Sequence, residues 1–363
     1  MYPERVNQIS PFIVMEVLEK AQQMERAGEN VIHLEVGEPD FDTPEGIIEA
    51  ARTALKDGET HYTHSLGIWE LREAVANHYK RKYHVEVDPA QVIIASGTSP
   101  GLLLLLSALL NPGDEVICSN PGYACYPNFV QYLDASINCI HVSEENGFQY
   151  RTEDVSKCMT RKTKAILINS PSNPTGNLLS PEIMDEISTL GPIVISDEIY
   201  HGLVYEEQEH SILEFTRNAV VLNGFSKLYA MTGWRLGYLI VPEEFVRPIQ
   251  KLLQNFFISA NAFVQRGGVA ALTAHHPEVD QMIETYNKRR KYMLSCLRKI
   301  GFKVAVEPKG AFYIFANAKQ FTSDSYKFAF DILERAKVAV TPGIDFGSNG
   351  EGFLRFSYAN SME

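Results

Sequence analysis

The stretch Asn223-Gly-Phe-Ser-Lys-Leu-Tyr-Ala-Met-Thr-Gly-Trp-Arg-Leu-Gly-Tyr238 carries the most information in this chain of 363 residues. It follows the apolar run 219–222, which is typical of a buried strand, and places Lys227 and Arg235 just beyond the strand end. Most lysines are solvated, but the apolar and glycine-rich flanks of Lys227 indicate a desolvated amine with a lowered pKa. Arg235 would either hold an anion or form a structural ion pair.

Similar apolar runs recur upstream, and helical stretches separate them. They cover residues 91–95, 114–118, 136–140, 165–168, 192–196 and 219–222. Short, almost continuous runs of this kind favour a mostly parallel sheet with helices on both faces. Residues 235–241 could add one more strand. The sequence therefore predicts an α/β fold with a large central sheet.

The two ends of the chain have a different pattern. Residues 13–30 predict a helix with Ser10 as N-cap, and residues 31–36 predict a strand. Beyond residue 243 we expect long helices to residue 299, then strands at 302–306, 312–315 and 353–358 around a helix at 324–337. We predict an N-terminal arm at 1–12, a smaller α+β domain from 13–36 and 272–363, and a large domain at 37–271.

Composition limits the function classes. Hydrophobic residues make up 45% of the chain, which is ordinary for a globular protein, and the net charge of −12 argues against a nucleic-acid-binding surface. No apolar run is long enough for a bilayer, and the N-terminus lacks the apolar core of a signal peptide. The five cysteines form no Cys-x-x-Cys pair, and the ten histidines have no metal-ligand spacing. We therefore expect a cytoplasmic protein without a membrane, nucleic-acid or metal partner.

Polar residues follow the predicted strands, and ligands of open parallel sheets bind beyond the carboxyl ends of strands. Asn173 follows one strand, and Asp197 and Tyr200 follow the next. A carboxylate directly after an apolar strand requires a hydrogen-bonding or charged partner, or else a functional role. Asp197 could also cap a helix. Asn173 stands in Asn-Pro-Thr-Gly, which is equally good turn chemistry.

Three further positions have two interpretations each. Tyr123 could stack on a flat ring or pack in the core. The backbone of Gly97-Thr98-Ser99 could bind an anion where a helix begins near Pro100, or form an ordinary turn with Ser99 as N-cap. Arg355, inside an apolar strand, would bind a carboxylate through its planar fork or form a buried salt bridge.

Taken together, these residues predict a cofactor. Lys227 offers an amine for a Schiff base, Asp197 a carboxylate for a ring nitrogen, and Arg235 a cation for a phosphate. Pyridoxal phosphate requires this set, since a protonated ring nitrogen withdraws electrons from the α-carbon of the substrate. The chain has no Gly-x-Gly-x-x-Gly, Walker, His-Glu-x-x-His or Gly-x-Ser-x-Gly pattern that would indicate another chemistry.

The same residues resemble the class I and II aminotransferases, which are fold-type I pyridoxal-phosphate-dependent enzymes of the aspartate aminotransferase superfamily. The resemblance runs from Val36-Gly-Glu-Pro-Asp-Phe-Asp-Thr-Pro44 to Leu354-Arg-Phe-Ser357. Its most specific parts are Ser172-Asn-Pro-Thr-Gly176 and the stretch from Ser226 to Gly237. The segment Tyr62–Arg72 looks like the family pattern Tyr-Thr-x-x-x-Gly-x-x-Glu-Leu-Arg.

The resemblance implies a role for each residue. Lys227 would carry the Schiff base and shuttle the proton, Asp197 would pair with the ring nitrogen, and Tyr123 would stack on the ring. Asn173 and Tyr200 would bind the phenolic oxygen. The cofactor phosphate would be held by Gly97, Thr98, Ser99, Ser226 and Arg235.

Two implied roles concern the substrate and a partner. Arg355, Asn173 and the backbone of Gly37 would bind the α-carboxylate of the substrate. Tyr62 would reach the phosphate in the neighbouring subunit, which implies a homodimer with shared sites. For the side chain of the substrate, an apolar or broad pocket is the hypothesis, with residues Phe12, Ile13, His64 and Phe257.

The chain also departs from the family pattern. Gly224 stands where many relatives have a phosphate-binding serine, and Ser99 where one subgroup has a lysine that recognises acidic substrates. His64 replaces a frequent proline. The chain ends soon after Arg355, where relatives usually add a final helix, so we expect that helix to be missing or trimmed.

The predicted function is amino transfer between an amino acid and a 2-oxo acid. The alternative on the same scaffold is a carbon–sulfur β-lyase or related elimination, in which the same carbanion expels a leaving group. Regulators that use this domain carry an N-terminal DNA-binding helix-turn-helix, and residues 1–35 are too short and not basic enough for one.

Overall fold

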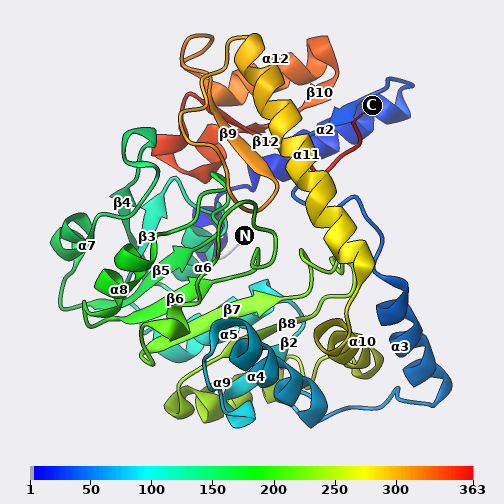
Figure 1. Ribbon diagram of the computed structural model, residues 1–363. Coiled ribbons are helices and arrows are strands. Elements are labelled where there is room, and N and C mark those ends of the chain that lie inside the picture. Colours follow the sequence, from blue (N-terminus) through cyan, green and yellow to red (C-terminus); the bar gives the residue numbers. More distant parts are fainter. Residues whose placement is uncertain (1–3, 363) are drawn as a thin grey trace.

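A seven-stranded sheet forms the centre of the computed structural model, which describes residues 4–362 (Figure 1). Its strands, in spatial order, are β2 (Val92–Ala95), β8 (Gly237–Ile240), β7 (Ala219–Gly224), β6 (Ile193–Asp197), β5 (Thr163–Asn169), β3 (Glu115–Asn120) and β4 (Ser136–His141). The strands from β7 to β4 pair in parallel, whereas β8 is antiparallel to both β7 and β2. The predicted mostly parallel α/β fold is confirmed.

Helices cover both faces of this sheet, as continuous apolar strands require. One face packs on α5 (Thr98–Leu109), α6 (Tyr126–Tyr132) and α9 (Glu243–Phe256). The opposite face packs on α4 (Trp69–Tyr83), α7 (Thr152–Cys158), α8 (Pro181–Ser188) and α10 (Ala262–Thr273), and α3 (Glu45–Lys56) lies against α10. Alternate residues of each strand serve the two faces: Ile93 contributes to one core and Ile94 to the other.

A second, smaller unit stands beyond the carboxyl ends of the parallel strands (Figure 1). It contains the antiparallel sheet β11 (Thr341–Pro342), β12 (Phe353–Ser357) and β9 (Tyr313–Asn317). The parallel pair β1 (Ile32–His33) and β10 (Val338–Ala339) joins the two ends of the chain. The helices of this unit are α2 (Ile13–Arg26), α11 (Pro277–Lys299) and α12 (Ser325–Ala336), and α1 (Glu4–Gln8) lies near α6.

The arrangement corrects three local expectations. Helix α2 is preceded by Phe12 as N-cap residue and not by Ser10, because the carboxylate of Asp345 accepts from the first N–H groups of the helix, those of Ile13 (2.9 Å) and Val14 (3.2 Å). Residues 302–306 form no strand, only an isolated bridge between Lys303 and Asn317. Helix α5 begins at Thr98, not near Pro100, with Gly97 as N-cap residue, so Ser99 lies inside the helix and does not cap it. The domain limits at residues 12, 36 and 272 stay a prediction, and for residues 1–3 and 363 that prediction lies outside the described residues.

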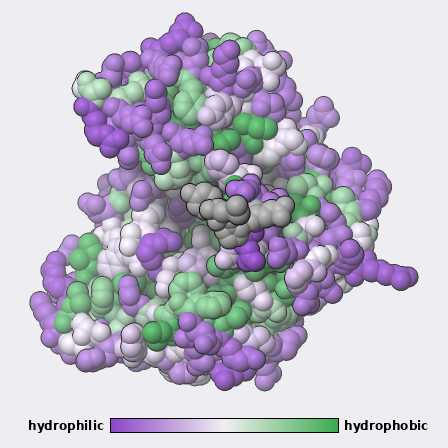
Figure 2. All heavy atoms as spheres, turned by 180° about the vertical axis from the view of Figure 1, so that it is seen from behind, coloured by the Kyte–Doolittle hydropathy of each residue, from purple (hydrophilic) through white to green (hydrophobic). Residues whose placement is uncertain are grey.

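The surface is mostly hydrophilic on the face opposite to Figure 1, with scattered hydrophobic residues (Figure 2). Within residues 4–362, none of the helices combines the length and the apolar character that a bilayer crossing requires. Large apolar side chains are nevertheless exposed around the end of α9, at Phe256, Phe257 and Ile258.

Candidate active site

A cavity of about 330 Å³ lies between the carboxyl ends of the parallel strands and the smaller unit. Its wall contains eleven of the thirteen residues that the sequence singled out. These are Gly37, Thr98, Ser99, Tyr123, Asn173, Asp197, Tyr200, Ser226, Lys227, Arg235 and Arg355. Gly97 lies directly behind this wall, against Arg235, whereas Tyr62 does not line the cavity. Residues up to 318 positions apart in the sequence therefore meet at one place, 37 to 355.

Lys227 projects into this cavity from the turn after β7. Its Nζ donates a hydrogen bond to the backbone carbonyl of Gly37 at 2.6 Å. Burial lowers the pKa of the Lys227 amine to about 8, against the attraction of Glu38 and with the help of the positive charges of Arg355 and Arg235. The side chain of Lys227 is only partly buried, because part of it faces the cavity. The amine at its end is enclosed by protein, and loss of hydration disfavours the charged form, which lowers the pKa. The predicted desolvated amine is present.

Asp197 is the last residue of β6 and is almost completely buried. Its Oδ2 accepts from the Tyr126 hydroxyl at 2.7 Å, and its Oδ1 accepts from the Ile199 backbone N–H at 3.1 Å. Burial raises the pKa of this carboxyl to about 6, while the two hydrogen bonds and the nearby Lys227 work in the opposite direction. Asp197 caps no regular helix, because residues 199–202 form a turn and not a helix. Tyr126 is a partner that the sequence reasoning did not find.

Arg355 and Asn173 form one unit at the boundary between the large sheet and the smaller unit. Arg355 Nη1 donates to Asn173 Oδ1 at 2.9 Å, and Nη2 donates to Thr341 Oγ1 at 3.1 Å and to the backbone carbonyl of Glu35. The guanidinium also lies over the ring of Tyr313, 4.3 Å from its centroid. Among the described residues, Arg355 Nε is buried without a partner. Arg355 forms no salt bridge with any residue from 4 to 362, so its charge is available to an anion.

The turn between β2 and α5 forms an anion cradle. Gly97 has φ of 106°, and a Cβ at this position would lie 2.7 Å from Arg235 Nη2. The guanidinium therefore rests on the glycine backbone, held by a hydrogen bond from its Nη1 to the Thr232 carbonyl at 2.9 Å. Thr98 and Ser99 are the first residues of α5, whose unpaired N–H groups and dipole favour a negative charge.

Gly224 shows why the serine of many relatives is absent here. A Cβ on Gly224 would lie 3.0 Å from both the Gly237 Cα and the Leu236 carbonyl oxygen. The residue sits inside β7, pressed against β8, and does not line the cavity. A side chain at this position would strain the sheet, whereas Ser226 and Arg235 both line the cavity.

The aromatic side chains complete the wall. Tyr123 stands edge-on to Tyr126, with ring centroids 5.1 Å apart, and edge-on to Phe12 at 6.1 Å. The Tyr200 hydroxyl forms a hydrogen bond of 2.8 Å with the Tyr313 hydroxyl. Tyr313 is a second residue that sequence reasoning missed, because it comes from β9, more than a hundred positions away.

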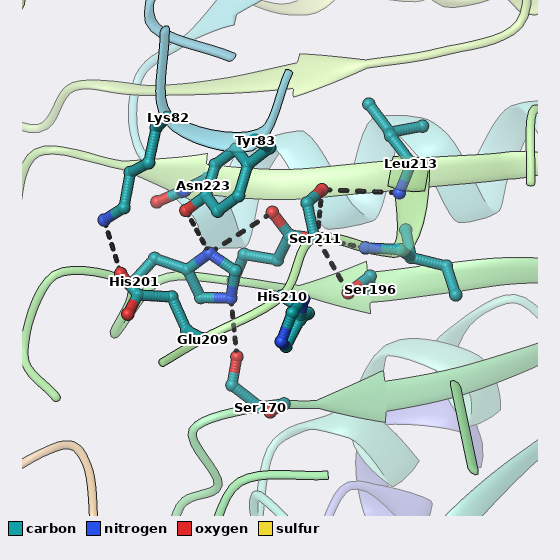
Figure 3. A network of polar contacts seen from close by, with 12 residues as sticks. Lys82, Tyr83, Ser170, Ser196, His201, Glu209, His210, Ser211, Leu213 and Asn223 are labelled. Carbon is teal, nitrogen blue, oxygen red and sulfur yellow. Dashed lines mark hydrogen bonds and ion pairs between the residues drawn. The ribbon is translucent and has the colours of Figure 1, made fainter. Parts of the chain in front are cut away.

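Behind the site, a buried polar network connects the strand ends (Figure 3). The His201 ring accepts from the Tyr83 hydroxyl at Nδ1 (2.6 Å) and donates from Nε2 to the Ser170 carbonyl (3.0 Å). Burial lowers the pKa of His201 to about 3, so the ring is neutral and this tautomer is fixed. Lys82 pairs with Glu209 at the edge of the network.

Glu198, next to Asp197, is the centre of the same network. Its carboxylate accepts from the Tyr79 hydroxyl at 2.9 Å, from two serine hydroxyls (Ser196 and Ser211) and from the Ile212 N–H. Asn223 Nδ2 donates to the Tyr79 hydroxyl at 3.4 Å. The network thereby joins the carboxyl ends of β5, β6 and β7. Asp197 is the last residue of β6, and Asn173 and Lys227 lie in the turns that follow β5 and β7.

These residues fit pyridoxal phosphate. The anion cradle suits a phosphate, Asp197 offers a carboxylate, and Lys227 offers an amine of lowered pKa, all on one cavity wall. Asn173 uses its oxygen for Arg355, which leaves its Nδ2 group available as a donor. Arg355, whose Nε has no hydrogen-bond partner among residues 4–362, adds a second cation for an anion on the same wall. A cofactor phosphate and a substrate carboxylate thus each have a separate cation.

Of the residues suggested for the substrate side chain, Phe12 lines the cavity, together with Val14, Met15, Val36 and Phe129. Ile13 lines the neighbouring cavity, and neither His64 nor Phe257 lines the main one. Tyr62 is 80% exposed.

Known proteins with similar sequences are aminotransferases. The family model for aminotransferase class I and II matches residues 29–363. A Methanocaldococcus jannaschii (5-formylfuran-3-yl)methyl phosphate transaminase is 43% identical over all of this chain and 96% of its own length. An aspartate aminotransferase of Pyrococcus horikoshii is 40% identical over 99% of this chain and 93% of its own.

Solved structures agree in fold. A Methanococcus jannaschii protein, described as similar in its active site to kynurenine aminotransferases, superposes with a TM-score of 0.92 at 42% identity, covering 99% of this chain and 96% of its own. An aspartate aminotransferase from Thermus thermophilus with maleate superposes with a TM-score of 0.94 at 35% identity and the same coverage.

Proposed function

The chain belongs to the class I and II aminotransferases, which depend on pyridoxal phosphate, and we propose that its reaction takes place in the cavity around Lys227. The observation that carries this proposal is the meeting of Lys227, Asp197, Arg235 and Arg355 on one wall. Each has a charge or pKa suited to one part of the cofactor or substrate. When bound, pyridoxal phosphate supplies an aldehyde for the amine and a ring that withdraws electrons from the α-carbon.

We assign the proton transfers to Lys227. A general base needs a pKa near the working pH, and burial brings the pKa of the Lys227 amine to about 8. The Gly37 carbonyl, 2.6 Å from Nζ, orients the amine at the cavity wall. Lys227 would take the proton from the α-carbon of the donor and return it on the way to the 2-oxo acid.

Asp197 would hold a positive charge on the cofactor ring. Its pKa of about 6 leaves it mostly ionised at neutral pH, and the Tyr126 hydroxyl fixes its orientation. An opposite charge close to the carboxylate would lower this pKa further. Asn173 and Tyr200 would donate to the phenolic oxygen, and Tyr123 would pack on the ring.

Two anions would be held at separate points. The phosphate would lie on the first turn of α5, against Thr98, Ser99, Ser226 and Arg235. The α-carboxylate of the substrate would lie on Arg355, whose Nη groups are pre-oriented by Asn173, Thr341 and the Glu35 carbonyl. Fixed orientation of this kind reduces the entropy lost on binding.

For the donor, we propose an amino acid with an apolar side chain. Phe12, Met15 and Phe129 line the cavity, and the cations lining it among the described residues are Lys227, Arg235 and Arg355. In this proposal each of these cations already binds the cofactor or the α-carboxylate. This chain would therefore supply no cation for a second carboxylate on the substrate. Glu38 at the same wall would repel it. This proposed donor differs from aspartate, for which some relatives are named.

We further propose a homodimer that works in a reducing cytoplasm. Tyr62 is 80% exposed and would be offered to the site of the neighbouring subunit. The exposed apolar side chains Phe256, Phe257 and Ile258 are suited to burial against a partner. The five cysteines are all free thiols, which fits a reducing compartment.

The test is a visible absorption spectrum of the purified protein, repeated after addition of each amino acid. We expect the band of the lysine-bound cofactor, its conversion to that of the amine form with apolar donors, and no band in Lys227→Ala. Strong preference for aspartate or glutamate would contradict the apolar donor. Release of ammonia and pyruvate without conversion would contradict amino transfer at this site.

A further inference from the structure

Two cysteines stand side by side outside the proposed catalytic machinery. Cys118 on β3 and Cys139 on β4 are direct partners in the parallel register, and their Sγ atoms are 3.9 Å apart. Neighbouring strands lie about 4.8 Å apart, which is inside the range of Cα separations, about 4.4–6.8 Å, that a disulfide spans. Because partners in register point to the same face, little movement is needed to join the two sulfurs.

The pair can be reached from a second cavity. Both residues line a cavity of about 500 Å³ between the ends of β3 and β4, the segment around Ser10 and the loop around Asp345. Cys139 is only half-buried, whereas Cys118 is 4% exposed. The wall also contains the turn that leads to Tyr123. A small oxidant would therefore meet Cys139 first.

The contact between the two sulfurs also makes the two thiols unequally reactive. A hydrogen bond from the Cys118 thiol lowers the pKa of Cys139, and the same contact, with burial, raises the pKa of Cys118. The thiolate is the nucleophile in thiol–disulfide exchange. The more exposed sulfur is thus the one that ionises more easily.

We propose that Cys118 and Cys139 form a redox modification site that closes reversibly to an intramolecular disulfide. With a small-molecule disulfide as oxidant, the Cys139 thiolate attacks one sulfur and expels the first thiolate. Cys118 then attacks Cys139 Sγ, which expels the second. The two cysteine protons pass to the two expelled thiolates, so two protein thiols are oxidised and one disulfide is reduced. A dithiol reductant reverses the sequence.

The test uses the holoenzyme with oxidised glutathione as the probe. Thiols are counted on the denaturant-unfolded protein before and after treatment, and the digested protein is mapped by mass spectrometry. We expect the loss of two of the five thiols, a crosslinked peptide pair containing Cys118 and Cys139, and full recovery with a dithiol. Cys158→Ser, which removes a half-buried cysteine outside this cavity, should behave like the wild type.

The variant Cys139→Ser should keep Cys118 reduced, since the deeper sulfur has lost both its partner and its route to the oxidant. Peptide mapping of the wild type decides the question even where a variant does not fold. A protein that keeps all five thiols would overturn the proposal. So would glutathione held on Cys139 without a crosslink, or a disulfide that involves Cys125, Cys158 or Cys296.

Discussion

At the scale of single residues, the site depends on charges that the fold holds in unfavourable surroundings. Lys227 has an amine whose pKa burial lowers to about 8, and Asp197 has a carboxyl whose pKa burial raises to about 6. Both changes reduce stability, because the folded chain disfavours the charged form of each group. Such a cost is expected where chemistry needs a reactive amine.

Replacing Lys227 by Met should therefore stabilise the cofactor-free protein at pH 7. The lowered pKa of the Lys227 amine means that burying its charge reduces the free energy of unfolding by about 3 kcal/mol, which the substitution restores. The substitution also removes the hydrogen bond to Gly37, at a cost of about 1 kcal/mol, so the net gain is about 2 kcal/mol. Between pH 8 and 10.5 the unfolded chain binds more protons than the folded one, so wild-type stability rises with pH there and the advantage of the variant disappears.

Urea unfolding of the two cofactor-free proteins at pH 7 and pH 10 measures this. Lys157→Met, at a side chain that is 72% exposed, is the control and should change the free energy of unfolding by less than about 0.5 kcal/mol. A Lys227→Met protein that is less stable than the wild type at pH 7 would show that the amine is not desolvated.

Arg355→Lys tests the carboxylate site. A lysine keeps the charge but loses the planar fork and its bonds to Asn173 and Thr341. Charge-assisted hydrogen bonds contribute about 1.5–3 kcal/mol, so the KM for the amino donor should rise roughly 10- to 150-fold. The cofactor spectrum should stay unchanged.

Steady-state kinetics with several donors measure the change, with Arg335→Lys as the control at a side chain that is 78% exposed. An Arg355→Lys enzyme with an unchanged KM and a shifted cofactor spectrum would place Arg355 on the cofactor instead.

At the scale of elements, the turns after the strands position the site. The turn from β2 to α5 is a compact example, because Gly97 combines a positive φ with close approach of Arg235. The buried network around Glu198 performs a similar task for the carboxyl ends of β5, β6 and β7. Polar contacts to α4 hold these strand ends, so the sheet and the helix behind it together position the cavity wall.

Gly97→Ala should weaken cofactor binding by at least about 10-fold, because the new methyl group displaces Arg235 from the cradle. It should also cost about 1–3 kcal/mol of stability, because φ of 106° with ψ of 168° is a backbone conformation that is essentially restricted to glycine. Gly113→Ala is the control for a positive φ without a clash: its φ is 83°, and a Cβ there meets nothing within 4 Å.

Both variants should therefore lose stability in thermal unfolding without cofactor, and Gly97→Ala should lose at least as much as Gly113→Ala. Only Gly97→Ala should raise the dissociation constant for pyridoxal phosphate in a fluorescence titration. Equal affinities in the two variants would mean that the Gly97 turn does not hold the phosphate.

At the scale of the whole molecule, the sheet and the smaller unit enclose the cavity, but one predicted residue remains outside it. Tyr62 does not line the cavity of its own chain and is 80% exposed. A shared site in a homodimer would give this tyrosine a function.

Mixing two inactive or weakened variants tests that arrangement. Dimers of Lys227→Ala have no amine, and dimers of Tyr62→Phe lack the tyrosine hydroxyl. In a mixed dimer, one site has Lys227 from one chain and Tyr62 from the other, so activity should recover to about half of the wild-type value per dimer.

The measurement is the transaminase rate after the variants are unfolded together and refolded, compared with variants refolded apart. The control mixture is Lys227→Ala with Asp197→Asn. Because both residues would belong to the same chain's site, each site of this mixed dimer has one defect and activity should not recover. A mixture with Tyr62→Phe that also failed to recover would put Tyr62 in its own chain's site.

The sequence alone determined the large sheet, since its apolar runs are local features with strand length and composition. It also determined the family, because Asn173, Asp197, Lys227 and Arg235 stand in fixed positions after those strands. Two predictions from short local patterns were wrong. Ser10 does not cap α2, and residues 302–306 form no strand.

Only the tertiary structure decided which residues touch. Tyr126 on Asp197, Tyr313 on Tyr200, and the Glu35 carbonyl on Arg355 join residues that are 71, 113 and 320 positions apart. The pairing of Cys118 with Cys139 likewise depends on the register of two strands. Periodicity and turn chemistry report on neighbours in the chain, whereas these contacts, and the pKa values that depend on burial, arise only once the sheet has folded.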